Sequence, residues 1–373
     1  MDLGSLGITE EQVELMDVAE NFCREKSDMA TVRNLLEDVN GFTRDLWDEV
    51  AALGWLGIAV PEEYDGVGLS LAEVVPVVEQ MGRRMMGLPF VTSTVAAQAI
   101  LFGGTEAQKQ DILPKIINGE AATLALSEIN GSYDLTNIEC EAVRTAEGFK
   151  LSGTKILVQN LDIAGWIVLS AKLDGSPAVF VFNYNLINAT QMRREKLIDE
   201  TKRSYELNLD GLVLPETALM DLDKTAVTLD RIDLVANLLG SAEMVGGAQA
   251  CIDYTVDYLT TRKQFGKLIG SYQALKHPTV DAYIGYEKAR SLLYAAANSF
   301  EDQGQGEVAT RMARVAAGRA LSYAADRSIQ FHGGFGFTYD CDAQLYRRRA
   351  IFHDSQFGDA RWHKAKLAKI LFN

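Results

Sequence analysis

The chain has 373 residues, a length that predicts two or three domains. Its residues are 47% hydrophobic and 23% charged, which is typical of a globular protein. Its net charge of −15 argues against binding to nucleic acid or to an anionic membrane, because both need a basic face. The four cysteines are widely spaced and form no CxxC pair, so they imply neither a zinc site nor a disulfide framework. We expect a cytoplasmic protein without signal peptide or membrane span.

The N-terminal part is predicted to be helical, because apolar residues recur at every third or fourth position. Predicted helices cover residues 10–40, 41–54, 70–81, 92–102 and 105–118. Ser70 is a suitable N-cap, and Thr105 opens a Thr-x-x-Gln capping box. We therefore predict an all-α domain over residues 1–120.

From Ala121 the pattern changes to short segments rich in Val, Ile, Leu and Thr, separated by Gly, Asn and Asp turns. Predicted strands cover residues 122–126, 140–145, 148–157, 163–171 and 178–182. Their regular spacing without helices between them predicts an antiparallel barrel or sandwich over residues 121–228.

A helical period then returns. Long helices are predicted near residues 229–261, 271–302, 306–331 and 341–371, enough for a four-helix bundle over residues 229–373. The predicted fold class is α+β, with a helical, a β and a second helical part in that order.

Two passages in the C-terminal third combine the features of an anion-binding corner. They are Thr261-Arg262-Lys263-Gln264-Phe265-Gly266 and Gln330-Phe331-His332-Gly333-Gly334-Phe335-Gly336-Phe337. Each offers a cation or polar side chain, an aromatic ring and glycines that let the backbone approach a ligand. We expect His332 to be a packed or hydrogen-bonded imidazole rather than a group that titrates beside the ligand.

With these passages the chain resembles the acyl-CoA dehydrogenase family over essentially its whole length. Leu53-Gly54-Trp55-Leu56-Gly57-Ile58, running into Pro61-Glu62-Glu63-Tyr64 and Gly66-Val67-Gly68, is similar to the N-terminal passage of the family. Arg262-x-x-Phe265-Gly266, Ile269-Gly270-x-Tyr272-Gln273 and Gln330-x-x-Gly333-Gly334-x-Gly336 are similar to its C-terminal signature.

The resemblance implies the family's fold, cofactor and reaction. FAD would lie between the β-domain and the C-terminal bundle, and a neighbouring subunit would reach across to its adenine and pyrophosphate. A carboxylate would remove the α-proton of an acyl-CoA thioester while hydride passes from the β-carbon to the flavin. Electron-transfer flavoprotein would be the acceptor.

The positions that would reach a neighbour's FAD keep suitable residue types. The resemblance assigns this role to Arg262, Phe265, Ile269, Gln273, Gln330, Gly333 and Gly334. The chemistry agrees, because arginine pairs with pyrophosphate, glutamine can bond ribose or adenine, and paired glycines give backbone access. No metal site is expected.

The positions that would hold the flavin ring do not match the family. Its Thr-Glu-Pro-Gly-Ala-Gly-Ser-Asp loop is replaced by Ser127-Glu128-Ile129-Asn130-Gly131-Ser132-Tyr133-Asp134, with Tyr133 in place of the phosphate-binding serine. Leu157-Val158-Gln159 replaces its Trp-x-Thr, and Gln356-Phe357-Gly358-Asp359-Ala360 replaces its Glu-Gly-Thr-x-Gln. A glycine loop filled by tyrosine does not easily admit phosphate to backbone N–H groups.

The catalytic base is also missing from its usual places. The two positions that supply it in the family align with Ala236 and Gln356, and neither is a carboxylate. Asp354, Asp359 and Glu243 are candidates for a relocated base, with Asp359 preferred, although a solvated or ion-paired carboxylate is the simpler reading.

The pattern therefore resembles a degenerate subunit of a heterotetrameric (α2β2) family member, whose homologous partner carries the catalytic Glu. Such pairs occur in the family among enzymes for bulky substrates such as steroid side chains. Two alternatives stay open: a self-sufficient homotetrameric dehydrogenase that uses Asp359, and a non-enzymatic scaffold.

Overall fold

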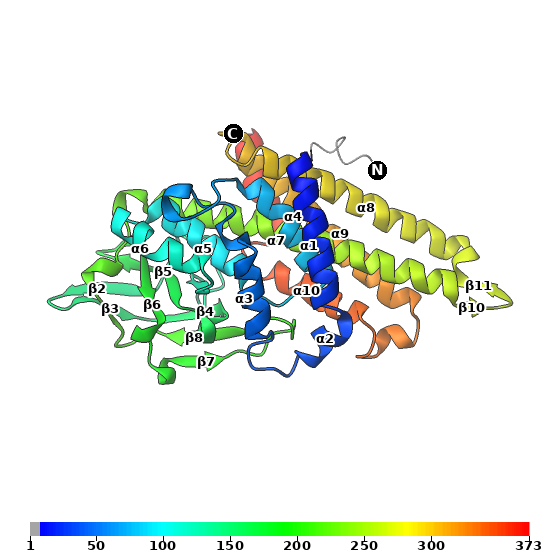
Figure 1. Ribbon diagram of the computed structural model, residues 1–373, viewed down its shortest axis with the longest axis horizontal. Coiled ribbons are helices and arrows are strands. Elements are labelled where there is room, and N and C mark those ends of the chain that lie inside the picture. The colour runs from blue at the N-terminus through cyan, green and yellow to red at the C-terminus, as the bar shows by residue number, and fades with distance from the viewer. Residues whose placement is uncertain (1–7, 373) are drawn as a thin grey trace.

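The computed structural model describes residues 8–372 and has the predicted order of helical, β and helical parts (Figure 1). The strands of the β-part gather at one end of the elongated molecule, and the small hairpin β10–β11 lies at the opposite end. None of the helices in residues 8–372 combines the length and apolarity that a bilayer span requires.

The N-terminal part contains six α-helices within the described residues. They are α1 (Glu10–Lys26), α2 (Met29–Asn34), α3 (Arg44–Ala52), α4 (Leu71–Arg83), α5 (Phe90–Gly103) and α6 (Glu106–Ile117). The predicted caps are confirmed, because Ser70 and Thr105 each close a capping box. The prediction of one helix over residues 10–40 was wrong: Ser27 ends α1, and the Asp28 side chain accepts a hydrogen bond from Thr31 N and starts α2.

The β-part contains two sheets with their own hydrophobic core. Its strands are β1 (Ala122–Ala125), β2 (Glu141–Thr145), β3 (Gly148–Ser152), β4 (Thr154–Gln159), β5 (Trp166–Leu173), β6 (Ser176–Asn183), β7 (Met192–Arg194), β8 (Ser204–Asn208) and β9 (Val213–Leu214). The larger sheet has the order β1-β5-β2-β3-β9, with β6 also paired to β5, and the smaller has the order β4-β8-β7.

Two features of these sheets differ from the prediction. Strands β1 and β2 both pair with β5 in parallel, so the larger sheet is mixed rather than purely antiparallel. The connections from β1 to β2 and from β2 to β5 are long enough for such crossovers. The predicted strand 148–157 is divided between β3 and β4 at Gly153, which has a φ of +108°.

The C-terminal part contains three long helices followed by two shorter ones. They are α7 (Thr225–Thr261), α8 (Gln273–Asn298), α9 (Gln305–Phe331), α10 (Ala343–Asp354) and α11 (Ala360–Phe372); strands β10 (Lys263–Gln264) and β11 (Lys267–Leu268) form the hairpin between α7 and α8. The predicted helix 341–371 is broken, because Phe357 and Gly358 adopt positive φ values of 50° and 104°. The domain boundaries after residues 120 and 228 stay a prediction.

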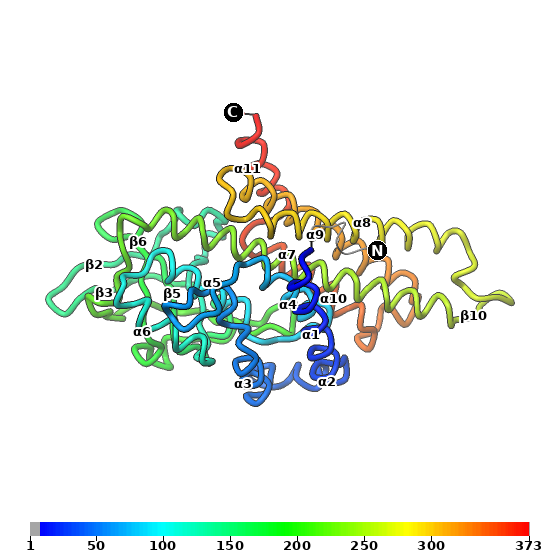
Figure 2. Tube along the Cα trace, turned by 45° about the horizontal axis from the view of Figure 1, so that its top comes forward, coloured from blue at the N-terminus to red at the C-terminus, as the bar shows by residue number. Residues whose placement is uncertain are grey.

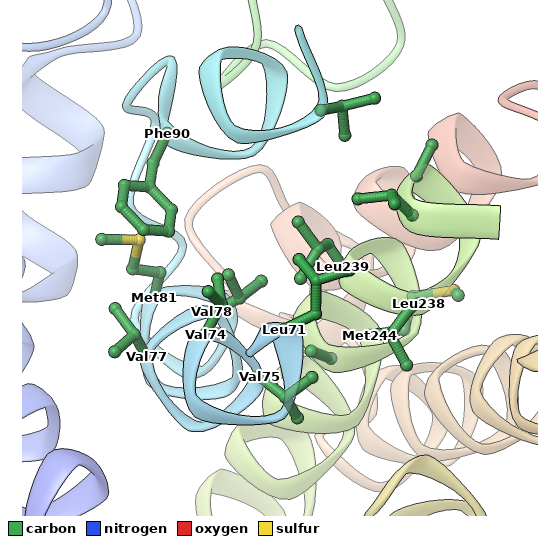
Figure 3. Close-up of a cluster of buried hydrophobic side chains, with 14 of the residues drawn as sticks. Leu71, Val74, Val75, Val77, Val78, Met81, Phe90, Leu238, Leu239 and Met244 are labelled. Atoms are coloured by element: carbon green, nitrogen blue, oxygen red, sulfur yellow. The ribbon is translucent and has the colours of Figure 1, made fainter. Parts of the chain in front are cut away.

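One hydrophobic core joins the N-terminal helices to the C-terminal ones. Figure 3 shows apolar side chains of α4, among them Leu71 and Val78, beside Leu239 of α7. A Cβ atom on Gly82 would lie 2.2 Å from the backbone oxygen of Glu243, and one on Gly246 would lie 1.9 Å from that of Glu79. Helices α4 and α7 therefore meet at backbone contact, which fixes the residues of α7 that face the β-part.

Candidate functional site

A small cavity lies where α5, β1, α7 and the α10–α11 connection meet. Its lining includes Ala236 from α7 and Gln356 from the connection, together with apolar residues such as Val95 and Leu124. The structure thus brings together the two positions at which the resemblance places a catalytic carboxylate. Neither residue present can act as a carboxylate base.

The cavity is too small for a cofactor ring. Its volume of about 60 Å³ holds a few water molecules, whereas small-molecule pockets have volumes on the order of 300–1,000 Å³. The Tyr133 hydroxyl donates to the backbone oxygen of Asp354 at 2.9 Å, and its ring lies 6.0 Å from that of Trp362. Gln159 Nε2 also lies 3.5 Å from Gln356 Oε1. Because the β-part touches the C-terminal helices directly here, the residues present do not fit a flavin ring.

Arg314 of α9 anchors the α10–α11 connection through hydrogen bonds. Its Nη2 atom donates to the backbone oxygens of Gln356 and Gly358, both at 3.2 Å. Its Nε atom donates to Asn237 Oδ1 at 3.0 Å, and Asn237 Nδ2 donates in turn to Phe357 O at 3.2 Å. Burial lowers the pKa of Arg314 to about 10, so the guanidinium stays charged near neutral pH.

Beside the cavity lies a buried ion-pair network centred on Glu243. Its Oε1 atom lies 2.7 Å from Lys202 Nζ and 2.6 Å from Arg349 Nη1, and Arg349 also pairs with Asp199. Burial alone would raise the pKa of the Glu243 carboxyl, but the charges of Lys202 and Arg349 hold it well below its usual range. Glu243 lines the cavity as a carboxylate that two cations already neutralise, which makes it a poor proton acceptor.

The other two candidate bases lie outside the cavity lining. Asp359 accepts a hydrogen bond from Trp362 N at 2.7 Å and so caps the first turn of α11. Both Asp354 and Asp359 border a surface hollow with Arg361 and Lys364. Burial raises the pKa of Asp354, while Arg314 and Arg347 lower it. These positions favour a structural role for both carboxylates.

The residues predicted to reach a neighbour's cofactor lie at the far end of the bundle (Figures 1 and 2). Arg262, Gln273, Gln330, Gly333 and Gly334 are exposed. Phe265 is 90% exposed at the tip of the β10–β11 hairpin. It has a φ of 55° and Gly266 a φ of 82°, as a tight two-residue turn requires.

The two passages meet through a small hydrophobic cluster. Leu259 at the end of α7, Ile269 after the hairpin and Phe331 at the end of α9 are buried together. Ile269 is only 9% exposed, so the structure gives it a packing position rather than a place on the surface. The cluster joins two segments that are about sixty residues apart into one surface, which carries the remaining predicted residues.

The structure adds Lys202 and Arg314, which sequence reasoning did not single out. The cavity is lined by Lys202, Arg314 and His353, and Arg349 forms an ion pair with Glu243 of the lining. The only signal for Arg349 was the run Arg347–Arg349, whose other members pair with Asp326 and Glu200. In the described part of the chain, no group of three or more His, Cys, Asp or Glu side chains is placed to hold a metal ion.

Comparison with known proteins gives consistent matches. Residues 9–120 match the acyl-CoA dehydrogenase N-terminal domain and residues 235–370 match the acyl-CoA dehydrogenase C-terminal domain. The chain is 28% identical to the mitochondrial isovaleryl-CoA dehydrogenase of Solanum tuberosum, over 90% of this chain and 85% of that protein. It is 29% identical to the acyl-CoA dehydrogenase FadE12 of Mycobacterium tuberculosis, over 79% of each. A solved structure, the Tcur3481–Tcur3483 steroid ACAD, superposes with a TM-score of 0.86 at 29% identity and covers 98% of each chain.

Proposed function

The chain belongs to the acyl-CoA dehydrogenase family, whose FAD-dependent members are oxidoreductases acting on CH–CH bonds, and from this we propose that it is a catalytically incomplete subunit of such an enzyme. In this proposal a homologous partner subunit binds the flavin ring and carries the catalytic Glu. This chain completes the partner's FAD site from the end of its bundle. FAD bound there supplies the hydride acceptor.

The observation that carries the proposal is the state of the chain's own site. Ala236 and Gln356 line a cavity of about 60 Å³, and the Tyr133 hydroxyl donates to Asp354 O where the β-part contacts the C-terminal helices. Glu243, the one carboxylate among residues 8–372 that lines the cavity, is held by Lys202 and Arg349. A site that lacks both room for the ring and a free carboxylate supports neither flavin binding nor proton abstraction by this chain.

The exposed end of the bundle supports the proposal that this chain completes the FAD site of its partner. Residues 258–280 contain four Lys or Arg side chains and no Asp or Glu, although the chain as a whole has a net charge of −15. Arg262, Lys263 and Lys267 form no ion pair with any of residues 8–372. Lys267 Nζ lies 4.2 Å from the centroid of the Tyr272 ring. Cations without an ion-pair partner, beside an exposed aromatic ring and a glycine turn, suit a pyrophosphate and an adenine.

The proposal also includes a substrate class, an electron acceptor and a cellular setting. Similarity to a steroid ACAD favours a bulky acyl-CoA thioester, such as a steroid side chain. Electron-transfer flavoprotein is the acceptor that the family resemblance implies. All four cysteines are buried and free, which supports a reducing, cytoplasmic setting.

The test is to purify the tagged chain alone and together with the chain that co-purifies with it, and to record the visible flavin spectrum of each. We expect the chain alone to be colourless and the pair to contain FAD. Arg262→Ala should lower the FAD content of the pair, because a buried pyrophosphate without its cation is costly. A yellow, active homo-oligomer of this chain would refute the proposal and favour the self-sufficient enzyme with Asp359. A chain that never contributes to flavin binding by any partner would favour the scaffold.

A further inference from the structure

His332 occupies an unusual place between the two passages at the end of the bundle. It is 4% exposed and directly precedes Gly333, which has a φ of +61°. Its ring stacks on Tyr254 with centroids 4.5 Å apart and planes at 14°, and on Tyr258 with centroids 4.2 Å apart and planes at 26°. The two tyrosines are one turn apart on α7, so the imidazole that ends α9 is held between successive turns of another helix.

A hydrogen bond sets the orientation of this ring. His332 Nδ1 lies 2.7 Å from the backbone oxygen of Ser328, which can only accept, so Nδ1 carries a proton and donates. Burial lowers the pKa of His332, and the ring is therefore neutral at physiological pH. A neutral ring with one donor satisfied can remain buried between two tyrosines at little cost.

Tyr258, one of the two stacked tyrosines, is hydrogen-bonded through its backbone to the hairpin that carries Arg262. Arg262 N donates to Tyr258 O at 2.9 Å, and Ile269 N donates to Arg262 O at 2.9 Å. Tyr258 also packs against the buried cluster of Leu259, Ile269 and Phe331. The ring of His332 thus contacts the same turn of α7 from which the hairpin leaves the helix.

We infer that His332 is a positioning residue, which fixes the Gly333–Gly334 turn against the end of α7 so that both passages meet the partner's FAD as one preformed surface. The inference rests on the proposed function. Glycine backbones sample many conformations when nothing holds them, and ordering them on binding weakens affinity. The stack removes this freedom before the ligand arrives.

The test measures FAD affinity in the complex of this chain with its co-purifying partner, by titrating FAD into the flavin-free complex and following flavin fluorescence. His332→Ala removes the stack, and we expect it to raise the Kd for FAD about tenfold with assembly intact. His332→Phe keeps the stack without the hydrogen bond, and its Kd should stay within about threefold of the unmodified complex. Lys150→Ala, at an exposed position on β3 at the opposite end of the molecule, is the control and should change nothing.

Three results would overturn the inference: an unchanged Kd in His332→Ala, an equal loss in His332→Ala and His332→Phe, or loss of the assembled mass in His332→Ala. Arg262→Ala, measured in parallel, separates this inference from the function on which it rests. If Arg262→Ala weakens FAD binding and His332→Ala does not, only the positioning role fails. If neither changes FAD binding, the proposed function fails as well.

Discussion

Acidification should destabilise this protein through two buried histidines. His353 beside the cavity and His363 on α11 are 5% and 0% exposed. Burial lowers the pKa of His353 from 6.5 to about 4, against an opposing effect of Glu243. Burial, with the charges of Arg314 and Arg311, lowers the pKa of His363 to about 3. Both imidazoles are therefore neutral in the folded chain.

The sign and size of the effect follow from proton linkage. Because each pKa is lower in the folded chain than in the unfolded one, the unfolded chain binds protons first as the pH falls. Neither histidine affects stability well above pH 6.5, and each lowers the free energy of unfolding from there down towards its folded pKa. At about pH 5 the loss is about 2 kcal/mol for each histidine, or about 4 kcal/mol for both.

The assay is urea denaturation followed by tryptophan fluorescence, repeated from about pH 8 to about pH 5. His353→Gln and His363→Gln should each be less stable than the unmodified chain at every pH, but each should remove about 2 kcal/mol of the fall between these limits. His277→Gln, at an exposed position, should keep the whole fall. If either buried variant showed the same pH dependence as the unmodified chain, that histidine would not be the source of the fall.

Three substitutions test the rest of the site. Arg349→Met should lower the free energy of unfolding by about 3–5 kcal/mol, because Asp199 and Glu243 would lose a buried cation; calorimetry that shows an unchanged Tm would contradict this. Asp359→Asn should leave both Tm and the turnover of the assembled enzyme nearly unchanged, since asparagine caps a helix as well as aspartate does; a collapse of turnover with assembly intact would place the base on this chain. Gln356→Glu should not make the isolated chain yellow or active, because the carboxyl group would enter a cavity without room for a flavin, and a flavin spectrum in this variant would count against the closed site.

Local signals predicted much of the fold. The caps at Ser70 and Thr105 depend on hydrogen bonds within one turn of helix, which short stretches of sequence specify. The helical and strand periods depend on which face of an element is buried, and they predicted the helical, β and helical order. Strands β7, β8 and β9 and the parallel pairing of β5 were not predicted, because short strands are defined by their neighbours rather than by their own composition.

For the site, the sequence by itself determined the residue types: Ala236 and Gln356 stand where the family resemblance implies a carboxylate, and Tyr133 stands where it implies a phosphate-binding serine. It also determined the residue types, such as Arg262 and Gly333, that the resemblance assigns to a neighbour's FAD. Only the tertiary structure decided that the β-part contacts the C-terminal helices where the resemblance would place the flavin ring. The hydrogen bond from Tyr133 to Asp354 joins residues more than two hundred positions apart. The tertiary structure likewise decided that Arg349, one of three consecutive arginines, is buried between two carboxylates. The energy of a charge depends on the solvent and partners around it in space, and consecutive residues with the same charge can have opposite surroundings.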